Sequence, residues 1–258
     1  MKLLVPVTRE SRILLGVAFF VAFVGLWSLL TWSGAVPKHF LASPWQTLLS
    51  GWDLFANQKF GFDVGMTVWR VVGGFLLAAV IAVPLGIAMG TYKPIEAFFE
   101  PFVSFARYLP ASAFIPLLIL WVGIGEAQKL TVIFIGCFFQ LTLMIAMIVA
   151  GTRRDLVEAA YTLGCRDSGV IRRVVLPGAA PDIAEALRQV LGLGWTYIIV
   201  AELIGASSGI GHMITDSQAL MATDHIIAGI VVIGLVGLLS DVLFKKANQH
   251  LFSWSLQR

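Results

Sequence analysis

The sequence predicts an all-α integral membrane protein with six transmembrane helices, forming a single domain over residues 1–258. Its residues are 58% hydrophobic and only 13% charged, whereas a soluble domain is usually about 45–50% apolar and about 25% charged. Six apolar runs approach or reach membrane-spanning length, and the basic residues gather on one side of these runs. The net charge of +3 therefore indicates membrane topology rather than nucleic-acid binding.

Each predicted helix rests on an apolar run, since a spanning helix needs about 20 mostly apolar residues. The first run follows basic residues, but it is longer than the apolar part of a signal peptide and no small-x-small cleavage site follows it, so we expect a retained helix. Pro110 and Pro116 interrupt the third run, and Glu202 the fifth; such breaks are tolerated where the backbone faces protein or a cavity. Segment 32–63 carries tryptophans and few charges, which predicts an amphipathic interfacial helix. The six predicted helices cover residues 13–31, 71–90, 108–125, 130–152, 189–215 and 226–240.

The basic residues predict the orientation, because cytoplasmic loops carry an excess of Lys and Arg. With a cytoplasmic N-terminus, fourteen of the eighteen basic residues fall inside and four outside. Both termini and the loop 153–188 are then cytoplasmic. The inside set is Lys2, Arg9, Arg12, Lys93, Arg107, Arg153, Arg154, Arg166, Arg172, Arg173, Arg188, Lys245, Lys246 and Arg258, and the outside set is Lys38, Lys59, Arg70 and Lys129.

The most informative polar segment lies in that loop. A helix is expected to start near Asp155, where the helix dipole favours an acidic residue, and to end at Gly164, with a second helix beyond. Leu156, Ala159, Ala160 and Leu163 have the spacing of one helix face. The segment reads Glu158-Ala159-Ala160, three residues, Gly164, nine residues, Val174, one residue, and Leu176-Pro177.

This spacing resembles the EAA loop of the permease subunits of bacterial ABC importers, with Val174 in place of the more usual isoleucine. Residues 107–129 and 192–214 resemble permeases of the nitrate, sulfonate, taurine and bicarbonate importers, and residues 221–230 look most like taurine and alkanesulfonate permeases. The resemblance covers about residues 40 to 250. It implies the type I ABC importer permease fold in the bacterial inner membrane.

The resemblance also implies partners and roles. The EAA-like residues Glu158, Ala159, Ala160, Leu163, Gly164, Leu176 and Pro177 are expected to dock an ATPase. The expected assembly has two permease copies (identical, or this chain with a related permease), two cytoplasmic ATPase subunits and a periplasmic solute-binding protein. ATP and Mg would be bound by the ATPase, since this chain has no GxxxxGK[ST] motif. The expected cargo is a small anion, with taurine or an alkanesulfonate favoured over nitrate or bicarbonate.

Two residues are candidates for the translocation pathway. Glu202 is a carboxylate in an apolar segment, where acids usually face the bundle interior or water, and Trp195 lies seven residues before it. A structural acid bonded to a neighbour is the alternative for Glu202. Arg70 and Arg107 lie near predicted membrane ends, where snorkelling to the interface is expected.

Other classes of function find less support in the sequence. No Cys/His cluster has metal-ligand spacing, and no Ser/His/Asp set is recognisable as catalytic, so we expect neither a metal site nor an enzyme. An ion-coupled secondary transporter usually has several intramembrane ionisable residues and inverted repeats. One intramembrane acid and no visible repeat make that class the weaker alternative.

Overall fold

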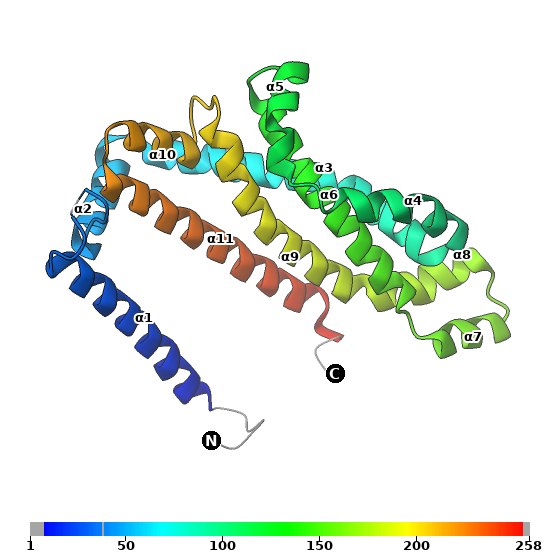
Figure 1. Ribbon diagram of the computed structural model, residues 1–258. Coiled ribbons are helices and arrows are strands. Elements are labelled where there is room, and N and C mark those ends of the chain that lie inside the picture. The colour runs from blue at the N-terminus through cyan, green and yellow to red at the C-terminus, as the bar shows by residue number, and fades with distance from the viewer. Residues whose placement is uncertain (1–7, 38, 255–258) are drawn as a thin grey trace. The chain divides into compact units, whose positions relative to one another are not determined.

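The computed structural model describes residues 8–37 and 39–254, and these fold into helices joined by turns. Lys2, Lys38 and Arg258, which carry part of the predicted charge bias, and both chain ends lie outside the described residues. Five helices are long and apolar enough to cross a membrane, and a bent pair of helices makes a sixth candidate span. The six-helix prediction is therefore confirmed, with different boundaries (Figure 1). The helices are α1 (Arg9–Trp32), α2 (Pro44–Asn57), α3 (Phe60–Thr91), α4 (Lys93–Ala106), the 3-10 helix η1 (Ala111–Phe114), α5 (Ile115–Val122), α6 (Glu126–Ala150), α7 (Arg154–Thr162), α8 (Asp167–Val170), the π-helical turn η2 (Ile171–Val175), α9 (Leu176–Leu203), α10 (Ile210–Ala219) and α11 (Thr223–Leu251).

The contacts divide the chain into two compact units, residues 1–60 with 213–231, and residues 61–212 with 232–258. Residues within each unit contact one another more than they contact the other unit. The single domain expected over residues 1–258 stays a prediction. In the first unit the apolar side chains of α1 are exposed, as suits a helix surrounded by lipid. The predicted interfacial helix is α2, which begins with a capping box at Ser43, and Ser50 on α2 donates a hydrogen bond to Asp224 at 2.5 Å.

The second unit is built around α6 and α9, which lie side by side and bury most of their apolar residues between neighbouring helices (Figure 1). Helix α3 packs closely against α6 because glycines line the contact. A Cβ atom at Gly74 would lie 2.7 Å from that of Ile133, and one at Gly86 would lie 2.8 Å from that of Ile145. Gly90 likewise faces the carbonyl of Ala146. The Gly86-x-x-x-Gly90 pattern is thus a packing surface.

Three helix boundaries differ from the predicted ones. Helix α3 begins at Phe60, eleven residues before the predicted start, so Arg70 lies inside it. The predicted cytoplasmic segment after α3 contains α4, which packs on α6. The expected helix 108–125, with its prolines at 110 and 116, is the second part of a bent pair, α4 with η1–α5, whose two parts meet at 84°.

The start of the fifth span also differs from the expected loop and helix. Residues 167–203 form one continuous run of helix, so Leu176 and Pro177 lie within it rather than at the end of a separate loop helix. The wider turn η2 comes immediately before α9. Pro177 has no N–H to bond to the preceding turn, which explains why the regular α-helical pattern is interrupted there.

Candidate coupling surface and buried charge network

The EAA-like segment forms the predicted helix, glycine turn and second helix. Helix α7 begins at Arg154, one residue before the expected start, and Arg153 pairs with Asp155 in its first turn. Hydrogen bonds from Arg153 hold the pKa of the Asp155 carboxyl below its ordinary value. The start of α7 is thus fixed by contacts between near neighbours in the sequence.

Gly164 ends α7 in a Schellman motif. The Gly164 N–H bonds to the Tyr161 carbonyl at 2.9 Å, and the Cys165 N–H bonds to the Ala160 carbonyl at 3.0 Å. Gly164 has φ = +80°, a conformation that favours glycine. The Tyr161 hydroxyl then donates to Asp167 at 3.1 Å across the turn, and this bond raises the pKa of Tyr161. The turn therefore fixes the direction of the chain between α7 and α8.

The predicted single face of α7 is divided between two sides. Ala160 is buried together with the partly buried Val157, whereas Leu156 and Ala159 are exposed and Leu163 is 84% exposed. The Glu158 side chain is also exposed and makes no ion pair with any residue that the structure describes. An exposed apolar and acidic surface is thus left for another molecule, while Ala160 anchors the helix.

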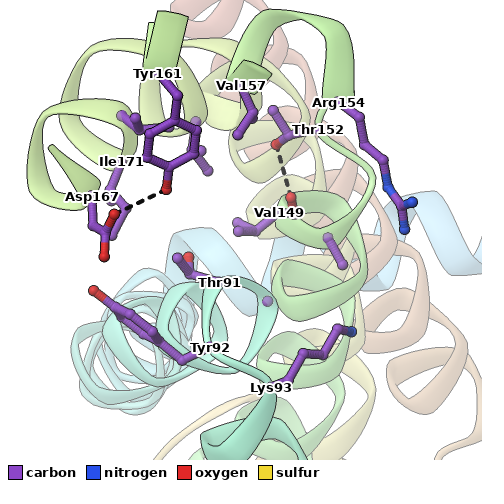
Figure 2. Close-up of a pocket in the computed structure, with 14 residues that line it drawn as sticks. Thr91, Tyr92, Lys93, Val149, Thr152, Arg154, Val157, Tyr161, Asp167 and Ile171 are labelled. Carbon is purple, nitrogen blue, oxygen red and sulfur yellow. Dashed lines mark hydrogen bonds between the residues drawn. The ribbon is translucent and has the colours of Figure 1, made fainter. Parts of the chain in front are cut away.

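A cavity of about 430 Å³ separates this helix–turn–helix from the ends of the membrane helices (Figure 2). Thr91, Tyr92 and Lys93 line it from the junction of α3 and α4, and Val157 and Tyr161 line it from α7. Beside this cavity, Ala160 and the partly buried Val157 still join α7 to the main apolar core.

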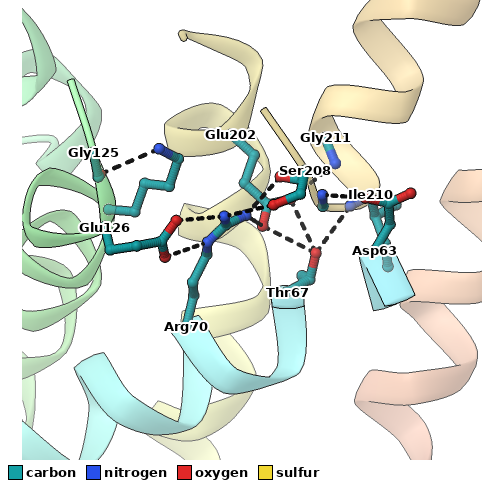
Figure 3. A network of polar contacts seen from close by, with 11 residues as sticks. Asp63, Thr67, Arg70, Gly125, Glu126, Glu202, Ser208, Ile210 and Gly211 are labelled. Carbon is teal, nitrogen blue, oxygen red and sulfur yellow. Dashed lines mark hydrogen bonds and ion pairs between the residues drawn. The ribbon is translucent and has the colours of Figure 1, made fainter. Parts of the chain in front are cut away.

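A second polar group lies at the opposite end of α6 and α9, where α3, α6 and α9 meet (Figure 3). Arg70 is fully buried and holds Glu126 through two bonds of 2.6 and 2.7 Å. It also donates to Glu202 at 2.7 Å. The interpretation of Arg70 as an exposed, snorkelling residue is wrong, because two carboxylates neutralise it inside the helix bundle.

The same group fixes the turn between α9 and α10. Arg70 donates to the Ser208 carbonyl at 2.7 Å and to its hydroxyl at 3.0 Å. Thr67 lies 3.0 Å from both Glu202 oxygens and accepts from the Ile210 N–H. Asp63 accepts from the Gly209 N–H at 2.7 Å. Asp63, Thr67 and Arg70 are spaced i, i+4, i+7 on α3, so one helix face holds the whole turn.

The glycines of this turn allow the close approach. The Gly211 N–H donates to Glu202 at 2.9 Å. A Cβ atom at Gly209 would lie 2.4 Å from Glu202 Oε1, and Gly209 has φ = +110°. A side chain would therefore displace the carboxylate. The Gly-Ile-Gly sequence at 209–211 therefore leaves room for the buried Glu202 carboxylate.

Glu202 is 1% exposed and faces these partners rather than lipid. These contacts are those of a structural acid bonded to its neighbours, which was the alternative interpretation of Glu202. Its place along the translocation pathway stays a prediction. Trp195 is buried and donates its indole N–H to Ser240 at 3.0 Å, which joins α9 to α11; its pathway role also stays a prediction. Lys129, counted as external, is only 2% exposed and donates to the Gly125 carbonyl.

Sequence reasoning missed the partners of Glu202. The signal was the Asp63–Thr67–Arg70 stripe, but it lay outside the predicted second helix and could not be read as a helix face. Arg188 was likewise assigned to a loop, whereas it lies in α9 and pairs with Glu185 and Asp241.

The comparisons with known proteins agree with this architecture. Residues 82–252 match the family described as binding-protein-dependent transport system inner membrane component. A probable ABC transporter permease protein of Brucella melitensis is 35% identical over 246 residues, which are 95% of this chain and 99% of the relative. The taurine transport system permease protein TauC of Escherichia coli is 28% identical, over 96% of this chain and 92% of the relative.

Solved structures show the same fold. A chain of the MetNI methionine ABC transporter, in an inward-facing conformation, superposes with a TM-score of 0.66 at 19% identity, covering 74% of this chain and 95% of that chain. The fold is that of type I ABC importer permeases. The family match covers two thirds of this multi-pass membrane chain, and its relative from Brucella melitensis supports the match over nearly the whole length. The chain therefore belongs to the family of inner membrane components of binding-protein-dependent transport systems.

Proposed function

We propose that this chain forms the translocation pathway for a small oxyanion, with taurine or an alkanesulfonate favoured, and that ATP hydrolysis on a partner subunit drives import. The observation that carries the coupling part is the exposure of α7 and its C-terminal cap, where the Glu158 and Leu163 side chains both lie open. An 84%-exposed leucine on a helix anchored by Ala160 and Val157 fits a site that a partner covers.

The coupling residues have distinct roles in this proposal. Leu163 and Ala159 supply the apolar contact, and Glu158 offers a charge to a basic residue of the ATPase. Gly164 sets the turn that keeps this surface rigid. Leu176 and Pro177 lie at the start of α9, so motion of α7 passes along a continuous helix into the membrane.

The assembly would contain two permease copies, two ATPase subunits that hold ATP and Mg, and a periplasmic binding protein that delivers the solute. The N- and C-termini would be cytoplasmic in the bacterial inner membrane. Relatives named for aliphatic sulfonate transport in Bacillus subtilis and taurine transport in Escherichia coli support the sulfonate class. A relative named as a nitrate import permease, 29% identical, supports nitrate as the second candidate.

The test is purification of the tagged chain from its native membranes, followed by reconstitution with the ATPase that accompanies it and with the binding protein. Uptake of labelled taurine, an alkanesulfonate, nitrate and bicarbonate is then measured with ATP inside the vesicles. We expect ATP-dependent uptake of a sulfonate that the binding protein also binds. Uptake driven by an ion gradient without ATP would contradict the proposal and favour a secondary transporter.

A further inference from the structure

The bent pair of helices places a break in a membrane span. Helix α4 ends in a tight turn, in which the N–H groups of Arg107, Tyr108 and Leu109 bond back to carbonyls of α4. Pro110 follows in an extended conformation and starts η1. A residue before proline avoids the helical region, so the chain cannot continue α4 past this point. Arg107 thus stands at the break.

The break lies beside the middle part of α6, a candidate membrane span. Helix α6 has 25 residues, or about 37 Å at the usual rise per residue. Near its centre, the Phe139 ring lies 5.9 Å from the Phe102 ring of α4. Beyond the break, η1 and α5 contact α6 and lead back to its first residue. The segment 111–122 therefore covers one half of α6, and α4 contacts the other half.

Arg107 is the basic residue at this depth that has no carboxylate partner within residues 8–37 and 39–254. Its guanidinium lies over the Tyr108 ring at 4.7 Å and donates to the Tyr108 hydroxyl at 2.7 Å, and both side chains are exposed. By contrast, Arg70 and Arg188 each hold two carboxylates. Arg107 therefore retains donors that nothing in the described chain occupies.

An unpaired guanidinium at mid-membrane depth is costly against lipid and is found where it faces water or a partner charge. Broken helices are tolerated at this depth where they line a cavity. The expected snorkelling of Arg107 to an interface conflicts with its place after α4, which packs beside the middle of α6. The broken helix and the unpaired guanidinium thus both indicate a water-accessible surface at Arg107.

We propose that Arg107, supported by Tyr108, lines the translocation pathway and contacts the oxyanion as it passes. A guanidinium donates two parallel hydrogen bonds to a sulfonate, carboxylate or nitrate. Tyr108 holds the guanidinium plane through stacking and a hydrogen bond, which leaves the opposite edge for the solute. The inference rests on the proposed function for the identity of its ligand, but the position of Arg107 is tested separately.

The position is tested by thiol labelling. Arg107→Cys is made with Cys137 and Cys165 replaced by serine, and the reconstituted transporter is treated with a charged, membrane-impermeant methanethiosulfonate. The matched control is Phe105→Cys, since Phe105 is 63% exposed at the end of the same helix. We expect the thiol of the Arg107→Cys variant to react at least tenfold faster than that of the Phe105→Cys variant, and saturating taurine on the binding protein to slow it. Equal, slow reaction of both variants would mean a lipid-facing Arg107 and would overturn the inference.

The role is tested by transport. Arg107→Gln should lower uptake of labelled taurine at least tenfold while ATP hydrolysis stimulated by the binding protein persists, and Arg107→Lys should recover part of the uptake. Lys246→Gln, an exposed cation on α11, is the control. If the Arg107→Gln variant takes up taurine like the parent, the inference about Arg107 is wrong, while the proposed function stands. A parent chain that takes up no oxyanion would overturn the proposed function, and with it the oxyanion as the ligand of Arg107.

Discussion

Removing the Arg70 side chain by Arg70→Met should destabilise the protein far more than an ordinary substitution. Arg70 holds Glu126 through two bonds, Glu202 through one and Ser208 through two. Without it, the Glu202 side chain, which is fully buried, has no neutralising charge. Breaking a buried pair from one side costs about 3–5 kcal/mol, so we expect a loss of that size in the free energy of unfolding.

The two carboxylates should share this loss unequally. The Glu126 side chain is 46% exposed and is rehydrated when Arg70 is lost, whereas the Glu202 side chain has no access to solvent. In double-mutant cycles, the coupling of Arg70 to Glu202 should be about 2–3 kcal/mol, and that to Glu126 about 1 kcal/mol or less. Arg70→Met combined with Glu202→Met should recover much of the stability lost by Arg70→Met, because no buried charge is left alone.

The assay is unfolding in mixed micelles by titration with a denaturing detergent, followed by tryptophan fluorescence. Lys246→Met serves as the control, since exposed substitutions usually change stability by less than about 0.5 kcal/mol. An Arg70→Met variant within about 1 kcal/mol of the parent would refute the reasoning. So would a stronger coupling to Glu126 than to Glu202.

Further results are expected at four other sites. Glu158→Lys or Gly164→Asp should abolish transport and ATPase pull-down while the protein stays in the membrane; undiminished pull-down with normal uptake would remove the coupling assignment. Arg166→Cys should react with an impermeant thiol reagent only from the cytoplasmic side, and labelling from outside intact cells would reverse the topology. Glu202→Gln should preserve assembly but alter ATP hydrolysis stimulated by substrate, and parental hydrolysis and transport would leave Glu202 a purely structural acid. Gly209→Ala should lower stability by about 2 kcal/mol or more, because its Cβ would meet Glu202, and parental stability would contradict the packing argument.

The parts of this protein that local sequence determines were predicted well. The α7 helix and its end at Gly164 depend on interactions within a dozen residues, so spacing alone located them. The apolar runs also located the membrane helices, since hydropathy measures what lipid requires. Hydropathy failed where polar residues are neutralised by distant ones: Asp63 and Arg70 made the start of α3 look external, although their partners at 202, 208 and 209 come more than a hundred residues later.

The break at Arg107 escaped prediction for a related reason. The apolar run 108–125 predicts one span that starts after Arg107, and it leaves the preceding α4 as a segment outside the membrane. The contact of Phe102 with Phe139 shows how deep that segment reaches along α6. The depth of a residue in the helix bundle depends on tertiary packing, so the distribution of basic residues along the sequence cannot predict it.

The distribution of charge within the membrane helices connects these observations. Arg70 and Arg188 are each matched by two carboxylates. Arg70 joins α3 to α6 and α9, and Arg188 joins the middle of α9 to α11. A permanent partner of that kind fixes a helix contact, and it also removes the cation from contact with a passing anion. Arg107 has no carboxylate partner among the described residues, and it lies on a break that packing against α6 supports from both sides. A transporter needs a cation that binds weakly enough to release its solute, and a guanidinium held by a tyrosine rather than by an acid meets that requirement.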